Sequence, residues 1–365
     1  MTDQFRPQDG LSTGPEVPAE PESPQTAPSY PQGEGVGADE VSRETSGADE
    51  GLRIRTAADI AAYGDDFDDM ATPLARAAQH SVLARQPQFR PSLPRPEATR
   101  VFVVANQKGG VGKTTSTVNI GAALAQLGQR VLIIDLDPQG NASTALSVAH
   151  HREVPGTYEV LVDGTPIADV VQPCAEDPAL FVVPATIDLA GAEIELVSVV
   201  AREGRLKKAI AAEPRVGTAA TAGEERFDYV LIDCPPSLGL LTLNALVAAD
   251  EMMIPIQAEY YALEGLGQLL ETVELVKADL NPGLTISTIL VTMYDARTRL
   301  ASGVAEEVRE HFGAQVLRTT IPRSVRVSEA PSYGQTVMAY DPGSSGALSY
   351  LEAAREIATK GVVTA

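Results

Sequence analysis

The chain is short of cysteine, of tryptophan and of long apolar runs. Its 365 residues include 2 cysteines and no tryptophan. Cys174 and Cys234 cannot build a disulfide framework or a four-cysteine metal site, so we expect a protein of a reducing cytosol. No stretch approaches the roughly 18 apolar residues of a bilayer span, and the first ten residues lack a basic segment followed by an apolar run. The sequence therefore predicts a protein that is neither secreted nor inserted in a membrane.

Basic residues are also few. The chain has 28 Lys and Arg against 49 Asp and Glu, which gives a formal net charge of -21. Nucleic-acid binding through overall charge is thereby excluded, because it depends on neutralising phosphates with Lys and Arg. Any contact with DNA must come from a local patch. Residues 1–50 contribute much of the acidity, since 11 Asp and Glu there face only Arg6 and Arg43.

The first hundred residues have the composition of a tail. Residues 1–50 are rich in Pro, Glu, Gly and Ser, so apolar burial cannot offset the entropy of ordering them. We expect residues 1–96 to be a disordered, acidic, Pro-rich tail. A short helix is predicted near residues 72–86, where Thr72 and Pro73 suit the N-cap and first helical positions. Two interpretations of it stay open: a transient helix, or a segment that docks a partner.

Residues 97–365 have the pattern of one α/β domain. Apolar, β-branched runs alternate with helical patterns, which predicts a mostly parallel sheet covered by helices on both faces. Residues 213–225 interrupt this rhythm with Gly, Ala and Thr and are expected to be an exposed, flexible insertion. The predicted strands carry the sequences VFVVAN, VLIIDLD, FVVPAT, YVLIDC, MMIPI, ISTILVTM and QVLRTTI.

The segment after the first predicted strand has the composition of a phosphate loop. Its glycines let backbone N–H groups turn toward phosphate oxygens, and the following helix adds the positive end of its dipole. Lys113 would bond the β- and γ-phosphates, and the Thr114 hydroxyl would reach Mg²⁺. The expected ATP-binding residues are Lys108, Gly109, Gly110, Val111, Gly112, Lys113, Thr114 and Thr115.

Gln107 occupies the position of the first glycine in the usual phosphate-loop pattern. The segment KGGVGKT resembles the deviant Walker A motif of the ParA, MinD and nitrogenase-iron-protein class of ATPases. The resemblance implies a P-loop NTPase fold, Mg²⁺-dependent ATP hydrolysis and a homodimer that forms on ATP binding. In that class the lysine at the position of Lys108 reaches the partner's nucleotide. A cation there would stabilise charge on the transferred phosphoryl group.

Acidic residues end two of the predicted strands, at the edge where an open α/β sheet binds ligands. Asp233, in DCPPSLG, is the candidate that orients Mg²⁺ or its bound water, together with Thr114. Asp137 lies in what resembles the first switch loop of the class, where the matching aspartate positions the attacking water. Asp135 is a further candidate for the metal. Lys108, Lys113 and Asp137 are thus the expected catalytic residues, although Asp before Pro or Gly commonly just forms a turn.

The chain resembles ParA-type chromosome-partitioning ATPases from about Val101 to Thr359. The resemblance implies an ATP-bound sandwich dimer that binds duplex DNA without sequence preference. It also implies a ParB-type partner that stimulates hydrolysis and so releases the dimer from DNA. Binding and release would segregate or position chromosome origins on the nucleoid, in the cytoplasm. The motifs that carry it are DLDPQGN, DCPPSLG, IPIQAEYYALEG, MYDART, IPRSVRVSEAPS and YDPGSSGA.

Arginines in two of these motifs match family positions implicated in DNA contact. They are Arg297 and Arg323, and Arg326 is a further candidate nearby. Such contacts predict steep salt dependence and no base code. The alternative for Arg323 is an ion pair with an acid such as Glu329, or packing against the adenine.

Other functions within the class stay open. A MinD-like membrane-cycling ATPase would need a basic amphipathic C-terminal helix. The only basic residues among the last 17 are Arg355 and Lys360. A ParA-like protein that positions another cargo is a second alternative. The first hundred residues are too polar for a helix-turn-helix, which favours a chromosomal rather than a plasmid type. For the tail we consider repulsion from DNA or docking of a polar scaffold protein.

Overall fold

The computed structural model describes residues 92–259 and 266–360. The predicted tail up to residue 91, including the helix near residues 72–86, lies outside the described residues. Residues just before the predicted domain start already contact the folded body. The backbone N–H of Leu93 donates to the oxygen of Leu127 at 3.0 Å, and Arg95 pairs with Asp228 at 2.7 Å.

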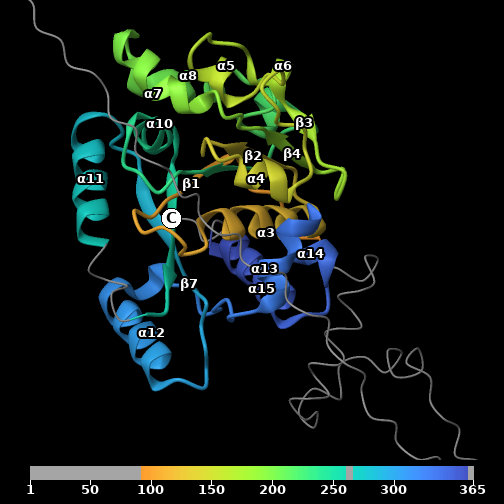
Figure 1. The fold of residues 1–365 in the computed structure, drawn as a ribbon, viewed down its shortest axis with the longest axis vertical. Coiled ribbons are helices and arrows are strands. Elements are labelled where there is room, and N and C mark those ends of the chain that lie inside the picture. Colours follow the sequence, from red (N-terminus) through yellow and green to blue (C-terminus); the bar gives the residue numbers. More distant parts are fainter. Residues whose placement is uncertain (1–91, 260–265, 361–365) are drawn as a thin grey trace, which may run out of the picture. The chain divides into compact units, whose positions relative to one another are not determined.

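Seven strands form one sheet in the order β3-β4-β2-β5-β1-β6-β7 (Figure 1). All neighbours pair in parallel except β3 and β4, which are antiparallel. This confirms the predicted mostly parallel sheet. The strand bounds are β1 Arg100–Val104, β2 Val131–Asp135, β3 Gln172–Pro173, β4 Leu180–Val183, β5 Tyr229–Asp233, β6 Glu251–Gln257 and β7 Thr285–Thr292.

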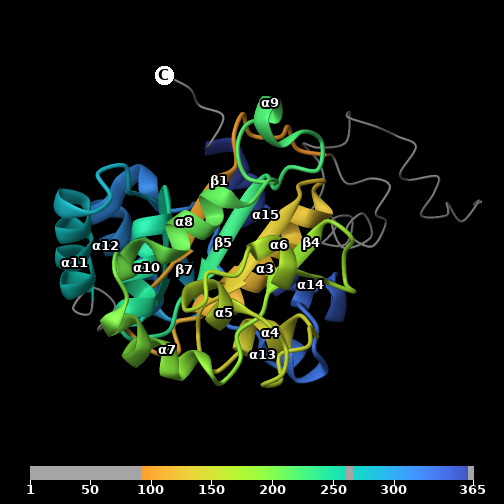
Figure 2. The ribbon, with the colours of Figure 1, turned by 90° about the horizontal axis from the view of Figure 1, so that it is seen from above.

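Helices cover both faces of the sheet, as the apolar runs predict. Val101 and Val103 of β1 point into one core, and Phe102 and Val104 point into the other. The first core is completed by α5 Thr157–Leu161, α6 Ile167–Val170, α7 Leu189–Glu195, α8 Arg205–Ala212, α10 Leu240–Ala248, α11 Leu266–Asp279 and α12 Arg299–Phe312. The second is completed by α3 Lys113–Gln126, α4 Asn141–Ala145, α13 Val325–Glu329, α14 Val337–Tyr340 and α15 Ser345–Lys360. Figure 2 shows α8 and α10 across the sheet from α15.

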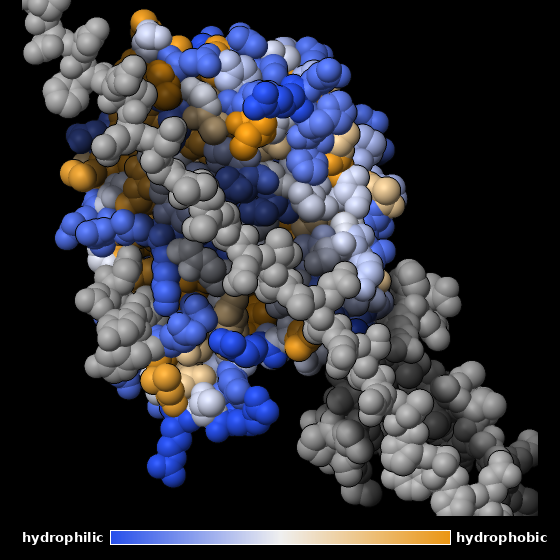
Figure 3. Space-filling view, viewed as in Figure 1, coloured by the Kyte–Doolittle hydropathy of each residue, from blue (hydrophilic) through white to orange (hydrophobic). Residues whose placement is uncertain are grey.

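The remaining short elements are the helix α9 Ala219–Ala222 and four 3-10 turns: η2 Leu196–Ser198, η3 Arg202–Gly204, η4 Gly313–Gln315 and η5 Ala330–Tyr333. No helix of the described residues is long and apolar enough to cross a membrane. Polar side chains predominate on the face shown in Figure 3, and the apolar ones form separate small patches.

Helix α3 lies unusually close to the sheet. A methyl group at Gly121 would come within 2.8 Å of Cδ1 of Ile133 in β2, so a larger residue there would push the helix away. Since α3 begins at Lys113, this close packing fixes the start of the helix above the end of β1. The phosphate loop is therefore held between two buried elements.

One predicted strand is wrong. The segment 315–321, QVLRTTI, forms no continuous strand: it makes an isolated bridge between Val316 and Ile289 of β7, and the N–H groups of Leu317 and Ile321 donate to β7. The backbone N–H groups of Arg318 and Thr319 donate instead to the carboxylate of Glu356 in α15, at 2.9 and 2.8 Å. Those donors are then unavailable to a continuous ladder.

The insertion at residues 213–225 is exposed beyond Gly217, as expected, but its base is fastened to the body. The N–H of Thr99 donates to the oxygen of Gly217 at 2.8 Å, and Arg215 pairs with the buried Glu213 at 2.6 Å. Its predicted flexibility stays a prediction.

Candidate nucleotide site and candidate DNA surface

The loop of residues 106–112 joins β1 to α3 and has the backbone of a phosphate cradle. Gly110 and Gly112 have positive φ angles of 75° and 88°, a region that side chains with a Cβ rarely adopt. The side chain of Asn106 donates to the oxygen of Pro255 at 2.8 Å and accepts from the N–H of Lys108 at 3.0 Å. These bonds tie the start of the loop to β6, while Gly109 and Gly110 face open space.

Lys113 opens α3 and is buried, with 7% of its surface exposed. Its Nζ donates to the backbone oxygen of Lys108 at 3.2 Å, across the loop. Burial lowers the pKa of Lys113, and the nearby carboxylates of Asp233 and Asp137 act against that shift. The ammonium group therefore lies between the loop and the acids, where it can meet phosphate oxygens.

Lys108 lies on the outer side of the loop. Its side chain is 37% exposed, and Nζ lies 3.5 Å from Oε2 of Glu259, just beyond the end of β6. Lys108 thus keeps a partly exposed side chain beside an acidic partner.

Asp135 and Asp233 are register partners at the carboxyl ends of β2 and β5, and both are fully buried. Thr117 of α3 donates to Oδ1 of Asp233 at 3.0 Å, while Oδ2 is buried and has no hydrogen-bond partner within residues 92–259 and 266–360. Burial, and then the charge of Asp135, raise the pKa of Asp233 to about 8. A carboxylate this crowded can be ionised at neutral pH when a cation lies beside it.

Asp135 anchors the loop that follows β2. It accepts from the N–H of Asp137 at 3.2 Å, from the N–H of Ser143 at 2.8 Å and from the Ser143 hydroxyl at 2.7 Å. Its pKa is raised to about 6 by burial, against the effect of these bonds. Both oxygens thus have partners within the protein, so the structure gives Asp135 a role in shaping the Asp137 loop.

Asp137 lies at the mouth of the site, with 7% of its surface exposed. Its Oδ1 accepts from the N–H of Gln139 at 3.0 Å, and no bond to Oδ2 is found among the described residues. One oxygen therefore fixes the side chain while the other can accept from a water molecule.

The acids suit Mg²⁺ held together with a nucleotide. No group of three or more His, Cys, Asp or Glu side chains in residues 92–259 and 266–360 forms a metal cage. Mg²⁺ usually keeps several waters and takes one or two carboxylates plus substrate phosphates. The Oδ2 atom of Asp233, for which no hydrogen-bond partner is found among the described residues, fits that kind of site, and the Thr114 side chain lies close enough to lower the pKa of this carboxyl.

The three candidate arginines are exposed and carry acidic partners. Arg297 makes a two-pronged pair with Asp295, with Nε–Oδ1 and Nη2–Oδ2 distances of 2.9 and 2.8 Å. Arg323 approaches Glu259, with Nη2 at 3.7 Å from Oε1. Arg326 pairs with Glu329 at 3.2 Å and lies 3.6 Å from Asp341. The alternative of an acidic partner for Arg323 is thus borne out, but with Glu259 instead of Glu329.

Several site residues escaped the sequence reasoning. Thr117 follows Lys113 by one helical turn, a spacing that places both on the same side of α3 and could have identified it. Ser143 lies in the short helix α4, just after the motif DLDPQGN, without a distinguishing pattern. Glu259 gave no signal, because its partners Lys108 and Arg323 are far away in sequence.

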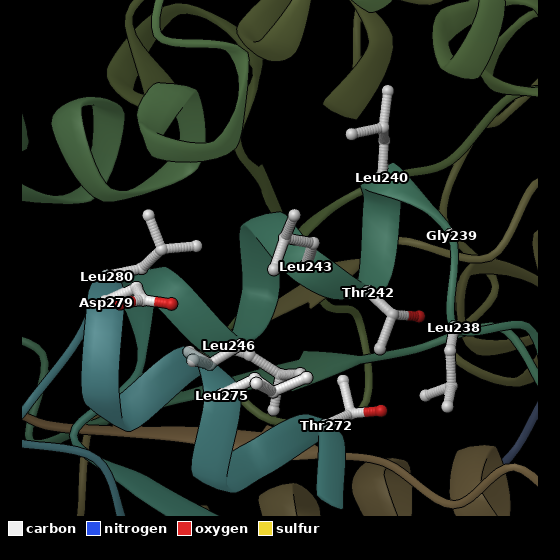
Figure 4. Close-up of a pocket in the computed structure, with 11 residues that line it drawn as sticks. Leu238, Gly239, Leu240, Thr242, Leu243, Leu246, Thr272, Leu275, Asp279 and Leu280 are labelled. Atoms are coloured by element: carbon white, nitrogen blue, oxygen red, sulfur yellow. The ribbon is translucent and has the colours of Figure 1, made fainter. Parts of the chain in front are cut away.

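A separate apolar groove of about 440 Å³ lies between α10 and α11 (Figure 4). Its lining is mostly leucine, which suits apolar contact rather than phosphate binding. The lining residues are Leu238, Gly239, Leu240, Thr242, Leu243, Leu246, Thr272, Leu275, Val276, Asp279 and Leu280.

Comparison with known proteins agrees with this geometry. A family model described as an AAA domain matches residues 99–286. Sporulation initiation inhibitor protein Soj of Bacillus subtilis is 51% identical over 262 residues, 72% of this chain and 99% of that protein. Chromosome partitioning protein ParA of Caulobacter vibrioides is 48% identical over 261 residues, 72% of this chain and 94% of that protein.

A solved structure of cobyrinic acid a,c-diamide synthase from Mycobacterium smegmatis, with a bound ATP analogue and magnesium, is also similar. It superposes with a TM-score of 0.58 at 40% identity, over 70% of this chain and 93% of that one. The family model spans the phosphate loop and both acidic strand ends, and the similarity to Soj and to ParA covers nearly the whole length of each. The chain belongs to the ParA/Soj family of P-loop ATPases.

Proposed function

We propose that the protein is an ATP-dependent DNA-partitioning ATPase. The observation that carries this proposal is a group of four side chains. The partly exposed Lys108 on the phosphate loop and the buried Lys113 at the start of α3 occur together with the buried Asp137 and Asp233. The name of the Caulobacter relative, chromosome partitioning protein ParA, supports chromosome partitioning as the process. ATP would close a sandwich dimer, and hydrolysis would open it.

Each residue has a distinct task in this proposal. Backbone N–H groups of residues 109–115 and the Lys113 ammonium bind the phosphates, and Thr114 and Asp233 hold Mg²⁺ or its water. Mg²⁺ supplies positive charge that polarises the phosphate oxygens. Asp137 orients the attacking water, and Asp135 keeps its loop in place through Ser143. Lys108 leaves its own subunit's surface and stabilises charge on the partner's γ-phosphate.

DNA binding is proposed for the exposed arginines at the same edge of the sheet. Arg297, Arg323 and Arg326 would contact phosphates of duplex DNA without reading bases. A ParB-type partner would stimulate hydrolysis and release the dimer from the nucleoid, in the cytoplasm. Residues 1–91, outside the described part, are proposed to dock a polar scaffold protein.

The test is binding to random-sequence duplex DNA with ATP, with ADP and without nucleotide. Wild type should bind with ATP alone. Asp137→Ala should stay bound because it cannot hydrolyse ATP, and Lys113→Ala should not bind because it cannot hold ATP. If ATP produces dimers that never bind DNA at low salt, DNA partitioning is overturned and another cargo becomes the leading hypothesis.

The M. smegmatis neighbour suggests amide formation as a second candidate. Enzymes that take nitrogen from glutamine commonly use an accessible cysteine thiolate as the nucleophile. Both cysteines here are buried, and burial raises the pKa of each thiol. Absence of ATP-dependent amide formation from cobyrinic acid with glutamine, and with ammonia, would remove this candidate.

The MinD-like alternative is less well supported. The basic residues near the end of α15 are engaged within the protein: Arg355 pairs with Glu352 at 3.2 Å, and Lys360 donates to the oxygen of Ala314 at 2.8 Å. Sedimentation with anionic lipid vesicles and ATP would reveal membrane binding directly.

A further inference from the structure

Glu259 lies between the phosphate loop and the candidate DNA surface. Its Oε2 faces Nζ of Lys108 at 3.5 Å, and its Oε1 faces Nη2 of Arg323 at 3.7 Å. The side-chain amide of Gln257 donates to Oε1 at 2.5 Å, which fixes the direction of the carboxylate. One carboxylate therefore holds two cations to which the proposed function gives different tasks.

The surrounding backbone keeps these groups together. The N–H of Ala258 donates to the oxygen of Thr292 at the end of β7, at 3.1 Å. The N–H of Arg323 donates to the oxygen of Tyr294, at 3.0 Å. Arg323 also lies near enough to Asp295 to help Arg297 lower the pKa of that carboxyl. Charges thus alternate from Lys108 through Glu259, Arg323 and Asp295 to Arg297.

We propose that Glu259 is a positioning residue that restrains both Lys108 and Arg323 in the free subunit. This inference rests on the proposed function, because it assumes that Lys108 moves to a partner's nucleotide and Arg323 to DNA. When either side chain moves, it loses its ion pair with Glu259. Glu259 therefore raises the ATP concentration needed for dimerisation and weakens DNA binding.

The size of the effect follows from exposure. The three side chains are 37%, 46% and 63% exposed, so solvent screens the pairs. Exposed ion pairs of this kind change an equilibrium constant by about two- to fivefold. A restraint of this strength can set a threshold without preventing the cycle.

The experiment compares Glu259→Gln with wild type and with Glu274→Gln. Glu274 forms an exposed pair with Lys277 on α11, so this control removes the same charge elsewhere. Dimerisation is measured by sedimentation during titration with a non-hydrolysable ATP analogue and Mg²⁺. We expect Glu259→Gln to lower the half-maximal analogue concentration about two- to fivefold, less at high salt, with unchanged melting temperature.

Measurements of DNA affinity separate the restraint on Arg323 from the restraint on Lys108. With the ATP analogue and Mg²⁺ at saturation, so that every variant is dimeric, Glu259→Gln should tighten binding to random duplex DNA about two- to fivefold, and this gain should vanish in an Arg323→Gln background. The gain in dimerisation should persist in that background.

Two results would overturn the restraint. One is equal behaviour of Glu259→Gln and Glu274→Gln. The other is a DNA gain that persists without Arg323, which would reflect general charge. If wild type itself neither dimerises with the analogue nor binds DNA, the failure lies in the proposed function instead.

Discussion

The acids beside the phosphate loop and the arginines beyond β7 lie at one edge of the sheet in opposite surroundings. Asp135 and Asp233 are fully buried, whereas the side chains of Arg297 and Arg323 are 87% and 63% exposed. Burial raises the pKa values of Asp135 and Asp233. Hydrogen bonds from Arg297, in contrast, lower the pKa of its partner Asp295 to about 2.

This difference in exposure determines whether a charged group responds to pH and bound cations or to ionic strength. Charges removed from water interact strongly and are insensitive to salt, while exposed pairs are screened within about 10 Å at 0.1 M salt. We therefore expect the acids to respond to pH and to bound cations. The arginines should respond to ionic strength.

The largest expected effect is on hydrolysis. Asp137→Ala should slow ATP turnover about a hundredfold or more, because it removes the group that directs the water. ATP binding should persist, since Lys113 and the loop are intact. Single-turnover hydrolysis and equilibrium nucleotide binding check this pair of outcomes. Asp188→Ala, at a side chain that is 41% exposed and distant in sequence from the phosphate loop, is the matched control; a wild-type rate in Asp137→Ala would refute the assignment.

The next effect is a pH dependence of stability without nucleotide or Mg²⁺. The folded pKa of Asp233 is raised to about 8 from a usual value of 3.8, so the folded state holds its proton more tightly than the unfolded state. The associated stability is fully present below about pH 4 and is lost as pH rises through 8. Asp233→Asn removes this loss, and its melting temperature should exceed that of wild type increasingly from pH 6 to about pH 8, with a constant gap above that.

Thermal unfolding over that pH range, with Asp188→Asn beside it, provides the measurement. Addition of Mg²⁺ and ATP should narrow the gap between Asp233→Asn and wild type, because the cation compensates the ionised carboxylate. A gap that does not change with pH would mean that Asp233 is ionised without difficulty in the free protein.

The sequence predicted the sheet and the phosphate loop because both depend on local signals. The run VFVVAN is apolar on both faces, and the glycines before Lys113 have few structural uses other than tight turns. The same reasoning placed Asp135 and Asp233 at one edge, since carboxyl ends of parallel strands meet there.

Contacts between distant segments were not predictable in this way. The run QVLRTTI has strand composition, but the carboxylate of Glu356 captures its N–H groups from 37 residues away. Glu259 likewise depends on Lys108, which is 151 residues away, and on Arg323. The pairing of Arg326, not Arg323, with Glu329 follows from the turn of α13, where the two are one helical turn apart.

A smaller effect, on DNA affinity, is expected when Arg297 or its acidic partner Asp295 is changed, and the two changes should act in opposite directions. Arg297→Gln should weaken DNA binding several-fold at low salt and reduce the salt slope by about one. Asp295→Asn should act oppositely, because it frees the guanidinium from a two-pronged pair. Affinity measured from about 50 to 200 mM salt tests both variants. Equal losses in the two variants would mean that the pair shapes the loop and does not contact DNA.

The smallest effect is expected at Arg326. Its guanidinium lies 3.2 Å from Glu329 and 3.6 Å from Asp341, so much of its charge is already compensated. Arg326→Gln should change DNA affinity by less than about twofold, within the range of exposed pairs. Arg355→Gln, which also breaks a pair with a glutamate one helical turn away, is the control in the same DNA titration. A loss as large as that of Arg297→Gln would place Arg326 at the DNA surface and show that DNA phosphate displaces both acids.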